Sequence, residues 1–117
     1  MWAGMILFKP EHIQPILEGR KTETRRSWKK PRAKKGAIHI AKTKMLSSDY
    51  FARIRIKYVR KQRLGAITTE EVLREGYSRK EEYLQKFIDI NKLKSITPND
   101  LIHSPFEVYV IGFEVVS

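Results

Sequence analysis

An alternation of apolar and basic residues in the middle of the chain constrains the fold most strongly. Between residues 50 and 64, alternate positions are apolar or aromatic, at Ala52, Ile54, Ile56 and Tyr58. The positions between them carry three cations, at Arg53, Arg55 and Lys57. A repeat of two residues is the repeat of a β-strand, whose successive side chains point to opposite faces. We therefore expect a long strand with one basic face and one buried face, on which Tyr58 lies beside Ile56.

Further strands are expected at residues 5–8, 37–41 and 106–116, where short apolar runs are bounded by polar or turn-forming residues. The last of these runs is apolar on both faces, which is typical of a central or barrel-closing strand. The segment around Pro98 is expected to form a turn or a single helical turn.

Three helices are expected between these strands. The first runs from Pro10 to Gly19, residue types that favour a helix start and the position just after a helix end. Capping boxes at Thr68 and Ser78 begin the second and the third, and Gly76 ends the second. The order strand, helix, strands, two helices, strand predicts an α+β fold, in which about three helices cover the side of a curled sheet or open mixed barrel.

Length and charge indicate one domain with a polyanionic partner. The chain has 117 residues, and we expect residues 1–117 to form a single domain. Its 24 Lys and Arg residues against 13 acidic residues give a formal net charge of +11. Such an excess attracts polyanions, and nucleic acid is the usual reason for it. A membrane surface is the competing partner, but it normally requires an amphipathic basic helix, whereas these cations are expected in loops and on strand faces.

Composition also excludes several kinds of site. The absence of cysteine excludes a disulfide partner, a thiolate nucleophile and a zinc finger. The apolar run at residues 1–8 is too short for a signal peptide or a bilayer span, so we expect a cytoplasmic protein without a membrane partner. No spacing of histidine or carboxylate resembles a metal site, and no cofactor is expected.

The residue types best suited to chemistry are concentrated in residues 19–26, Gly-Arg-Lys-Thr-Glu-Thr-Arg-Arg, which we call the motif. The motif holds one amine, two hydroxyls, one carboxylate and three guanidinium groups. It opens a segment, residues 20–35, with nine Lys or Arg residues, in which Trp28 is the only large aromatic side chain. Trp28 either stacks on a base, which contributes about 1–3 kcal/mol, or covers the edge of the core. The three cations of residues 53–57 are likewise either a phosphate track or an ordinary exposed strand face.

Three stretches of this sequence resemble the ASCH domain family. They are Ile-Leu-Phe-Lys-Pro-Glu at residues 6–11, the pattern Gly-x-Lys-Thr-x-Thr-x-Arg within residues 16–26, and Val-Tyr-Val-Ile-Gly-Phe-Glu at residues 108–114. The resemblance covers the chain nearly from end to end. It implies a PUA-like β-barrel with an RNA-binding cleft beside the first helix.

One branch of that family consists of small amidohydrolases that remove the acetyl group from N4-acetylcytidine. The resemblance to this branch implies catalytic roles for Lys21, Thr24 and Glu75, with Glu71 as the alternative carboxylate. The chain departs from the branch in its insert at residues 27–35 and in its higher positive charge. Both departures favour a substrate longer than a nucleoside.

Amide hydrolysis by this set requires Thr24 as nucleophile, Lys21 as base and Glu75 as proton donor. The alternative for Glu75 is a carboxylate that forms a salt bridge with Arg25. A lysine acts as a base only when its pKa lies well below about 10.4. We expect burial and the charges of Arg20, Arg25 and Arg26 to lower the Lys21 pKa in this way. Residues three apart in an extended strand point to opposite faces. Lys21 and Thr24 therefore share a site only if the chain turns or bulges between residues 19 and 25.

The function we predict from the sequence is recognition of RNA or a nucleotide by a basic cleft around the motif. The residues expected to bind the ligand are Arg20, Arg25, Arg26, Trp28, Arg53, Arg55 and Lys57. The alternative is an amidohydrolase acting on N4-acetylcytidine or a related acylated nucleoside. A ribonuclease is a further alternative, although no neighbour marks His12, His39 or His103 as its acid or base.

Overall fold

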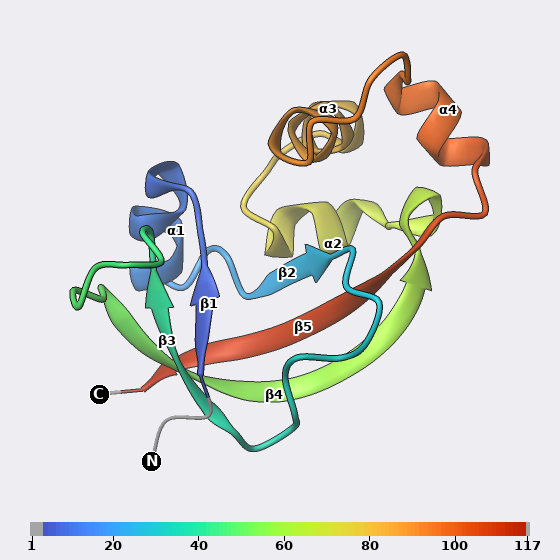
Figure 1. Cartoon of the computed structure of the whole chain (residues 1–117). Helices are drawn as coiled ribbons and strands as arrows, with labels where there is room; N and C mark the ends of the chain where they lie inside the picture. The colour runs from blue at the N-terminus through green and yellow to red at the C-terminus, as the bar shows by residue number, and fades with distance from the viewer. Residues whose placement is uncertain (1–3, 117) are drawn as a thin grey trace.

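A strongly curled five-stranded sheet carries the fold of residues 4–116, the part of the chain that the computed structural model describes (Figure 1). Its strands are β1 (Met5–Leu7), β2 (Glu23–Arg26), β3 (Ile38–Lys42), β4 (Ala52–Arg63) and β5 (Glu107–Val116). They lie in the order β1-β3-β4-β5-β2. Only the β1–β3 pair is parallel, and the other pairs are antiparallel. The two ends of the predicted domain, residues 1–3 and 117, lie outside the described residues.

The sheet is mixed and, within residues 4–116, it does not close into a hydrogen-bonded barrel. Its two edges are β1 and β2, between which no backbone ladder forms among the described residues. The predicted α+β class is confirmed. The short strand β2, which the sequence does not predict, is formed by four polar residues of the motif because they pair with the apolar strand β5.

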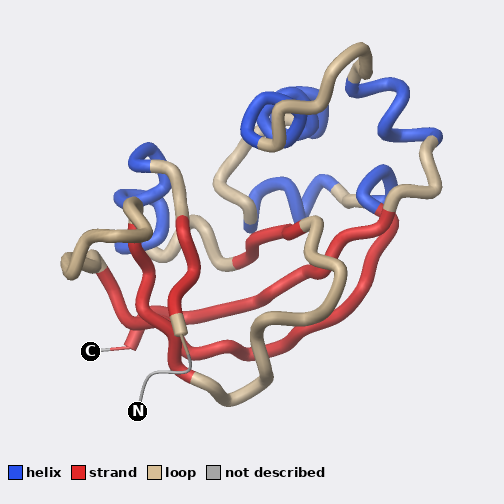
Figure 2. Tube along the Cα trace, viewed as in Figure 1, coloured by secondary structure: helices blue, strands red, loops and turns tan. Residues whose placement is uncertain are grey.

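Helices lie on the concave side of the sheet in two groups, which Figure 2 shows in blue above the curving strands. The first group is a 3₁₀ turn, η1 (Pro10–His12), continued by α1 (Ile13–Leu17). The second group contains η2 (Leu64–Ala66), α2 (Thr69–Arg74), α3 (Lys80–Ile90) and α4 (Pro98–His103). The described residues thus form four α-helices rather than about three, because a capping box between Thr97 and Asp100 extends the turn around Pro98 into α4.

The two predicted capping boxes have different outcomes. The Thr68 side chain accepts a hydrogen bond from the Glu71 N–H and the Glu71 carboxylate accepts one from the Thr68 N–H, so this prediction is confirmed. The Ser78 prediction is wrong, since α3 begins at Lys80 after an N-cap residue, Arg79, that makes no side-chain capping bond. The Arg79 backbone is extended, with φ −130° and ψ 138°, so Lys80 is the first helical residue.

The predicted alternation along β4 holds only as far as Ile56. The pairing register of β4 and β5 shifts between Ile56 and Tyr58, so that Ile56 pairs with Phe113 and Tyr58 pairs with Gly112. Adjacent residues of β5 point to opposite faces, and Tyr58 therefore leaves the face of Ile56, contrary to the prediction. The Tyr58 ring lies against Gly112, where an added Cβ would lie 2.1 Å from a ring atom.

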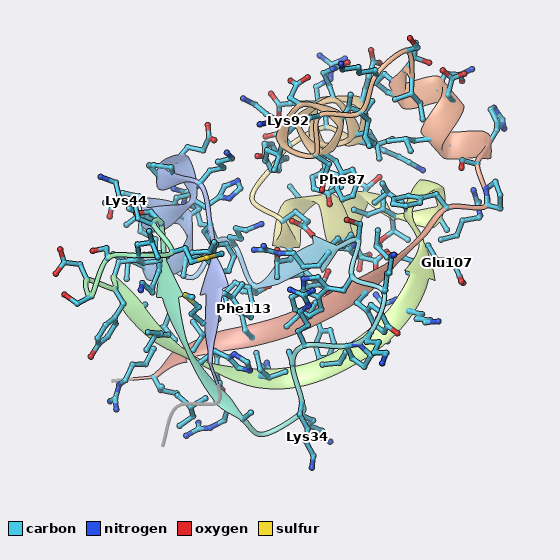
Figure 3. The ribbon with its side chains drawn as sticks, viewed as in Figure 1. Lys34, Lys44, Phe87, Lys92, Glu107 and Phe113 are labelled. Atoms are coloured by element: carbon cyan, nitrogen blue, oxygen red, sulfur yellow. The ribbon has the colours of Figure 1, made fainter. Side chains whose placement is uncertain are left out.

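Buried apolar side chains form two clusters. The sheet cluster lines the concave side of the sheet and includes Ile6, Phe8, Ile16, Ile54, Ile56, Ile111 and Phe113. The helical cluster joins α2, α3, α4 and the start of β5 and includes Leu64, Val72, Tyr83, Leu84, Phe87, Leu101 and Val108. Figure 3 shows Phe113 within the curve of the sheet and Phe87 on the side of α3 that faces it. The site described below lies where the two clusters meet.

Candidate functional site

The end of α1 directs the motif away from a regular strand. Gly19 has a positive φ of 77°, a conformation that glycine adopts without strain. The N–H groups of Arg20 and Lys21 then both donate to the Pro15 carbonyl, at 2.8 and 3.0 Å. Strand β2 begins only at Glu23. The chain therefore turns before the strand, and Lys21 and Thr24 line the same cavity although they are three residues apart.

This cavity, which we call the α3 pocket, has a volume of about 280 Å³. One part of its lining is polar and comes mostly from the motif: Lys21, Thr24, Arg25, Arg26 and Glu75. Another part is apolar or aromatic and includes Phe8 just after β1, Tyr77 between α2 and α3, and Tyr83, Phe87 and Ile90 from α3. Further lining residues are Lys9, His12, Thr43, Lys86 and Asn91. Such a mixture of aromatic walls and a few converging polar groups is typical of small-ligand sites.

A buried network of ion pairs forms the polar wall. Lys21 Nζ donates to Glu75 Oε1 at 2.7 Å and to the Glu75 carbonyl at 3.1 Å. Arg25 Nη1 donates to Glu75 Oε2 at 2.9 Å, and Arg25 Nη2 donates to Glu71 Oε2 at 3.0 Å. All four side chains are buried. Each oxygen of the Glu75 carboxylate therefore accepts from its own cation, which fixes the carboxylate in the pocket wall.

Glu71 supports the network from behind the pocket, which it does not line. Burial alone would raise the pKa of Glu71, but hydrogen bonds from the Thr68 N–H, Gln62 and Arg60, together with the charge of Arg25, outweigh it and lower this pKa to about 2. Of the two carboxylates that the sequence leaves as alternatives, Glu75 is thus the one in contact with the cavity.

Lys21 is the buried amine of the site. Burial lowers its pKa below the usual value, and the charges of Arg26 and Arg25 lower it further, against the opposing effect of Glu75. Arg20, also expected to contribute, is exposed and pairs with Glu18 at 2.8 Å outside the pocket. The pKa of Lys21 thus moves toward the range in which a lysine can act as a base, mainly through desolvation.

Arg26 joins the two edges of the open sheet. Its Nε donates to Thr24 Oγ1 at 3.0 Å, and its Nη2 donates to the Leu7 carbonyl of β1 at 2.6 Å. The guanidinium carbon lies 5.0 Å from the centre of the Phe8 ring, within cation–π range. Because Thr24 accepts from Arg26, its own hydroxyl proton is left to be donated elsewhere.

Tyr77 and His12 are site residues that the sequence does not reveal. Their hydroxyl and Nε2 lie 3.0 Å apart at the pocket wall. Burial, assisted by the charges of Lys21, Arg26 and Lys86, lowers the pKa of His12 to about 3, and burial raises the pKa of Tyr77 to about 12. Both groups are therefore uncharged near neutral pH. The other two described histidines, His39 on β3 and His103 at the end of α4, do not line the pocket.

Tyr83 and Phe87 have the i, i+4 spacing of a core pair on a helix, and nothing in the sequence marks them as site residues. Both are buried in the helical cluster, and both also line the α3 pocket. Nothing in a helical stripe distinguishes a wall of a cavity from a face of a packed core, since both need apolar side chains at the same spacing.

The predicted binding residues do not form one basic cleft. The α3 pocket brings together Arg25 and Arg26 from that set, but not the other five, which are Arg20, Trp28, Arg53, Arg55 and Lys57. Trp28 is half-buried and packs against the sheet cluster, as expected of a cover over the core edge. The three cations of β4 lie on a strand whose apolar face forms the core, so they are directed away from it.

The part of the chain that the structure describes shows neither a metal site nor a membrane-spanning helix. Among residues 4–116, no group of three or more His, Asp or Glu side chains is placed to hold a metal ion. In the same range, no helix has both the length and the apolar character needed to cross a bilayer.

Comparison with solved structures identifies the fold. The ASCH domain of Lactobacillus crispatus matches with a TM-score of 0.68 and 15% identity, covering 96% of this chain and 78% of that one. An ASCH structure from Zymomonas mobilis matches with a TM-score of 0.63 and 11% identity, covering 95% and 68%. The chain has the ASCH fold. A DUF984 protein from Enterococcus faecalis also matches, with a TM-score of 0.62 and 23% identity over 91% of this chain and 70% of that one.

The likeness to ASCH structures lies in the fold rather than in close sequence similarity. No protein-family model matches the chain, and no curated protein matches it. Two of the resembling stretches pair in this fold, since residues 23–26 of the motif form β2 and residues 109–112, within the stretch 108–114, are its partners on β5. The specific resemblance to N4-acetylcytidine amidohydrolases stays a prediction.

Proposed function

We propose that this ASCH-fold chain recognises RNA or a modified nucleoside by holding a single base in the α3 pocket. The observation that carries the proposal is the convergence of aromatic walls and buried polar groups on one cavity of about 280 Å³. That volume lies near the lower end of the range for ligand pockets, so it suits one base with its sugar better than a longer stretch of chain.

The two walls have complementary tasks in this proposal. Phe8, Tyr77 and Phe87 offer aromatic surface to a base, and each base–aromatic stack contributes about 1–3 kcal/mol. Lys21 and Thr24 offer hydrogen-bonding groups to the polar edge of the base. Because the buried cations are held in place by carboxylates, they need no rearrangement on binding, which lowers the entropic cost of recognition. Arg26, by bridging β2 and β1, supplies the side-chain link that would complete a PUA-like barrel around the pocket.

A second candidate function, hydrolysis of an acylated nucleoside, is favoured by the surroundings of Lys21. In this candidate, Thr24 Oγ attacks the acyl carbonyl, Lys21 removes the hydroxyl proton and then gives it to the departing amine, and water hydrolyses the resulting ester. Glu75 accepts hydrogen bonds from two cations, so its role here is to orient Lys21 rather than to donate a proton. The lowered pKa of Lys21 supports its role as the base.

One experiment tests both candidates. N4-acetylcytidine, cytidine and short RNA oligomers are titrated against the protein by calorimetry, and acetate release is measured in the same samples. Binding without acetate release supports recognition alone, whereas acetate release that disappears in Thr24→Ala supports hydrolysis. The matched control is Ser27→Ala, which removes an exposed hydroxyl one residue after the motif and outside the α3 pocket. Absence of both binding and release with every probe would overturn the proposal.

A further inference from the structure

A second hollow borders the motif, and no role described so far uses it. This hollow, which we call the β4 pocket, has a volume of about 530 Å³. It touches the motif at Thr22 and Glu23, the two residues between Lys21 and Thr24 of the α3 pocket. The remaining polar lining consists of Lys57, Tyr58 and Arg60 from β4 and Arg74 from the end of α2.

The wall between the two pockets is short and firmly held. The Thr22 N–H donates to the Arg74 carbonyl at 2.7 Å, and the Phe113 N–H donates to the Thr22 carbonyl at 3.0 Å. These bonds tie the motif to α2 on one side and to β5 on the other. Since even a fully extended chain advances only about 3.3 Å per residue, the backbones of Lys21 and Thr24 lie at most about 10 Å apart. The wall between the two pockets is therefore only two residues wide.

Cations around the β4 pocket keep donors available for a ligand. Arg74 lies 3.6 Å from Glu23 and 4.0 Å from Glu70, both beyond hydrogen-bond range, and its side chain is 47% exposed. Lys57 is exposed at the bulge of β4, and none of the ion pairs among the described residues involves it. Arg60 pairs with Glu71 but is 42% exposed. These three cations face a single lining carboxylate.

That carboxylate, Glu23, is already compensated by its neighbours. It is fully buried, and the Tyr58 hydroxyl donates to Oε2. Burial and the Glu23 hydrogen bond raise the pKa of Tyr58 to about 12, so the phenol keeps its proton at neutral pH. Arg25 Nη1 forms an ion pair at 3.0 Å with Oε1, the other oxygen of this carboxylate. Glu23 therefore holds Tyr58 in the pocket without presenting an unpaired negative charge to a ligand.

We propose that the β4 pocket binds the phosphate of the nucleotide adjacent to the base in the α3 pocket, with Lys57 and Arg74 as the contacting cations. The ligand class is then single-stranded RNA rather than a free nucleoside. This inference rests on the proposed function, because it needs a base in the α3 pocket to fix the position of the neighbouring phosphate. Tyr58 supplies an aromatic face beside the phosphate on which the next base can stack.

The test compares a nucleoside with the same base inside a trinucleotide, in which the central nucleotide has a phosphate on each side. Cytidine and N4-acetylcytidine are used as nucleosides, and UpCpU and its N4-acetylated form as trinucleotides. The test variant Lys57→Gln/Arg74→Gln removes the two cations. The matched control Lys94→Gln/Arg79→Gln removes the same two charges at exposed positions that line neither pocket.

The test variant is expected to bind the trinucleotide about tenfold more weakly than the control. Its log–log salt slope should be smaller by about 0.7, since the two cations contact one phosphate and each phosphate contact on a single strand contributes about 0.7. Nucleoside affinity should be equal in the two variants. Equal trinucleotide affinity and slope in the two variants, with nucleoside binding present, would overturn this inference alone. Absence of nucleoside and trinucleotide binding in the unmodified protein would overturn the proposed function as well.

Discussion

Arg25 and Arg55 lie on the two strands that flank β5, yet their surroundings are opposite. Arg25 is 4% exposed, and its guanidinium lies within ion-pair distance of Glu23, Glu71 and Glu75. Arg55 is exposed, and its cross-strand neighbour on β5 is Glu114. The same side chain is thus an internal structural element on β2 and a solvated surface charge on β4.

This contrast changes the meaning of the net charge. The formal net charge of +11 includes cations that form buried ion pairs, such as Lys21 and Arg25 with Glu75. Those cations shape a pocket and keep its polar groups fixed, whereas the exposed ones attract polyanions at longer range. The positive charge therefore belongs to two sets of cations, one buried and ion-paired and the other exposed, and each set can be removed separately by mutation.

Removing the buried cation should have the largest effect. Arg25→Ala leaves three carboxylates, Glu23, Glu71 and Glu75, without their shared partner, and breaking a buried ion pair in this way costs about 3–5 kcal/mol. Arg55→Ala, the control on the other strand, should change the free energy of unfolding by no more than about 0.5 kcal/mol. Urea unfolding at pH 7 measures both. A difference below about 1 kcal/mol between the two variants would show that the network does not stabilise the fold.

Acid should weaken the buried network through Glu71. Its pKa is about 2 in the folded protein and 4.5 as a free group, so the unfolded state binds more protons between these values. The stabilisation is therefore complete above pH 4.5 and is lost as the pH falls toward 2, by on the order of 3 kcal/mol in total. Unfolding measured across this range should show a shallower pH dependence in Glu71→Gln. Identical slopes in the two proteins would contradict the assignment.

The β4 pocket depends on the contact between Tyr58 and Gly112. Gly112→Ala puts a Cβ where the Tyr58 ring lies, and such overpacking costs about 1–3 kcal/mol. The same substitution in a Tyr58→Ala background should cost much less, because the clash is then absent. Thermal unfolding of the four proteins in this cycle measures the coupling. Equal costs in both backgrounds would mean that the ring does not occupy the space above Gly112.

The smallest expected effect is a difference in stability between variants of the two capping boxes, of which only the one at Thr68 also contacts the buried ion-pair network. Thr68→Ala and Thr97→Ala each remove a capping box, at a cost of about 1 kcal/mol. Only Thr68 also positions Glu71, which contacts Arg25. The Thr68 variant should therefore be the less stable of the two when both are unfolded in urea. If the Thr97 variant were instead the less stable one, Thr68 would not help to hold Glu71 in the ion-pair network.

The sequence predicts well what local patterns control. The alternation from Ala52 to Ile56 predicts β4, and Thr68 followed by Glu71 predicts the start of α2, because each signal lies within a few residues. Gly19 predicts the end of the first helical segment in the same way. These are properties of the backbone and of neighbouring side chains, and the fold leaves them unchanged.

Features that arise from pairing between distant segments could not be predicted. The bulge at Lys57 becomes visible only when β5 supplies Gly112 as the partner of Tyr58. The burial of Arg25 depends on Glu71 and Glu75 of another element, so nothing within the motif distinguishes it from the exposed Arg20. The hydroxyl of Tyr77 contacts His12, which lies 65 residues earlier in the chain.

The most direct test of the α3 pocket as the recognition site is a titration of the ¹⁵N-labelled protein with N4-acetylcytidine and cytidine, followed by amide chemical shifts. The largest shifts are expected at Lys21, Thr24 and Tyr77, which border the pocket, with none along residues 53–55. Shifts confined to residues 29–35 and 53–57 would instead assign binding to the exposed cations. That result, or the absence of any shift with either nucleoside, would contradict recognition by the pocket.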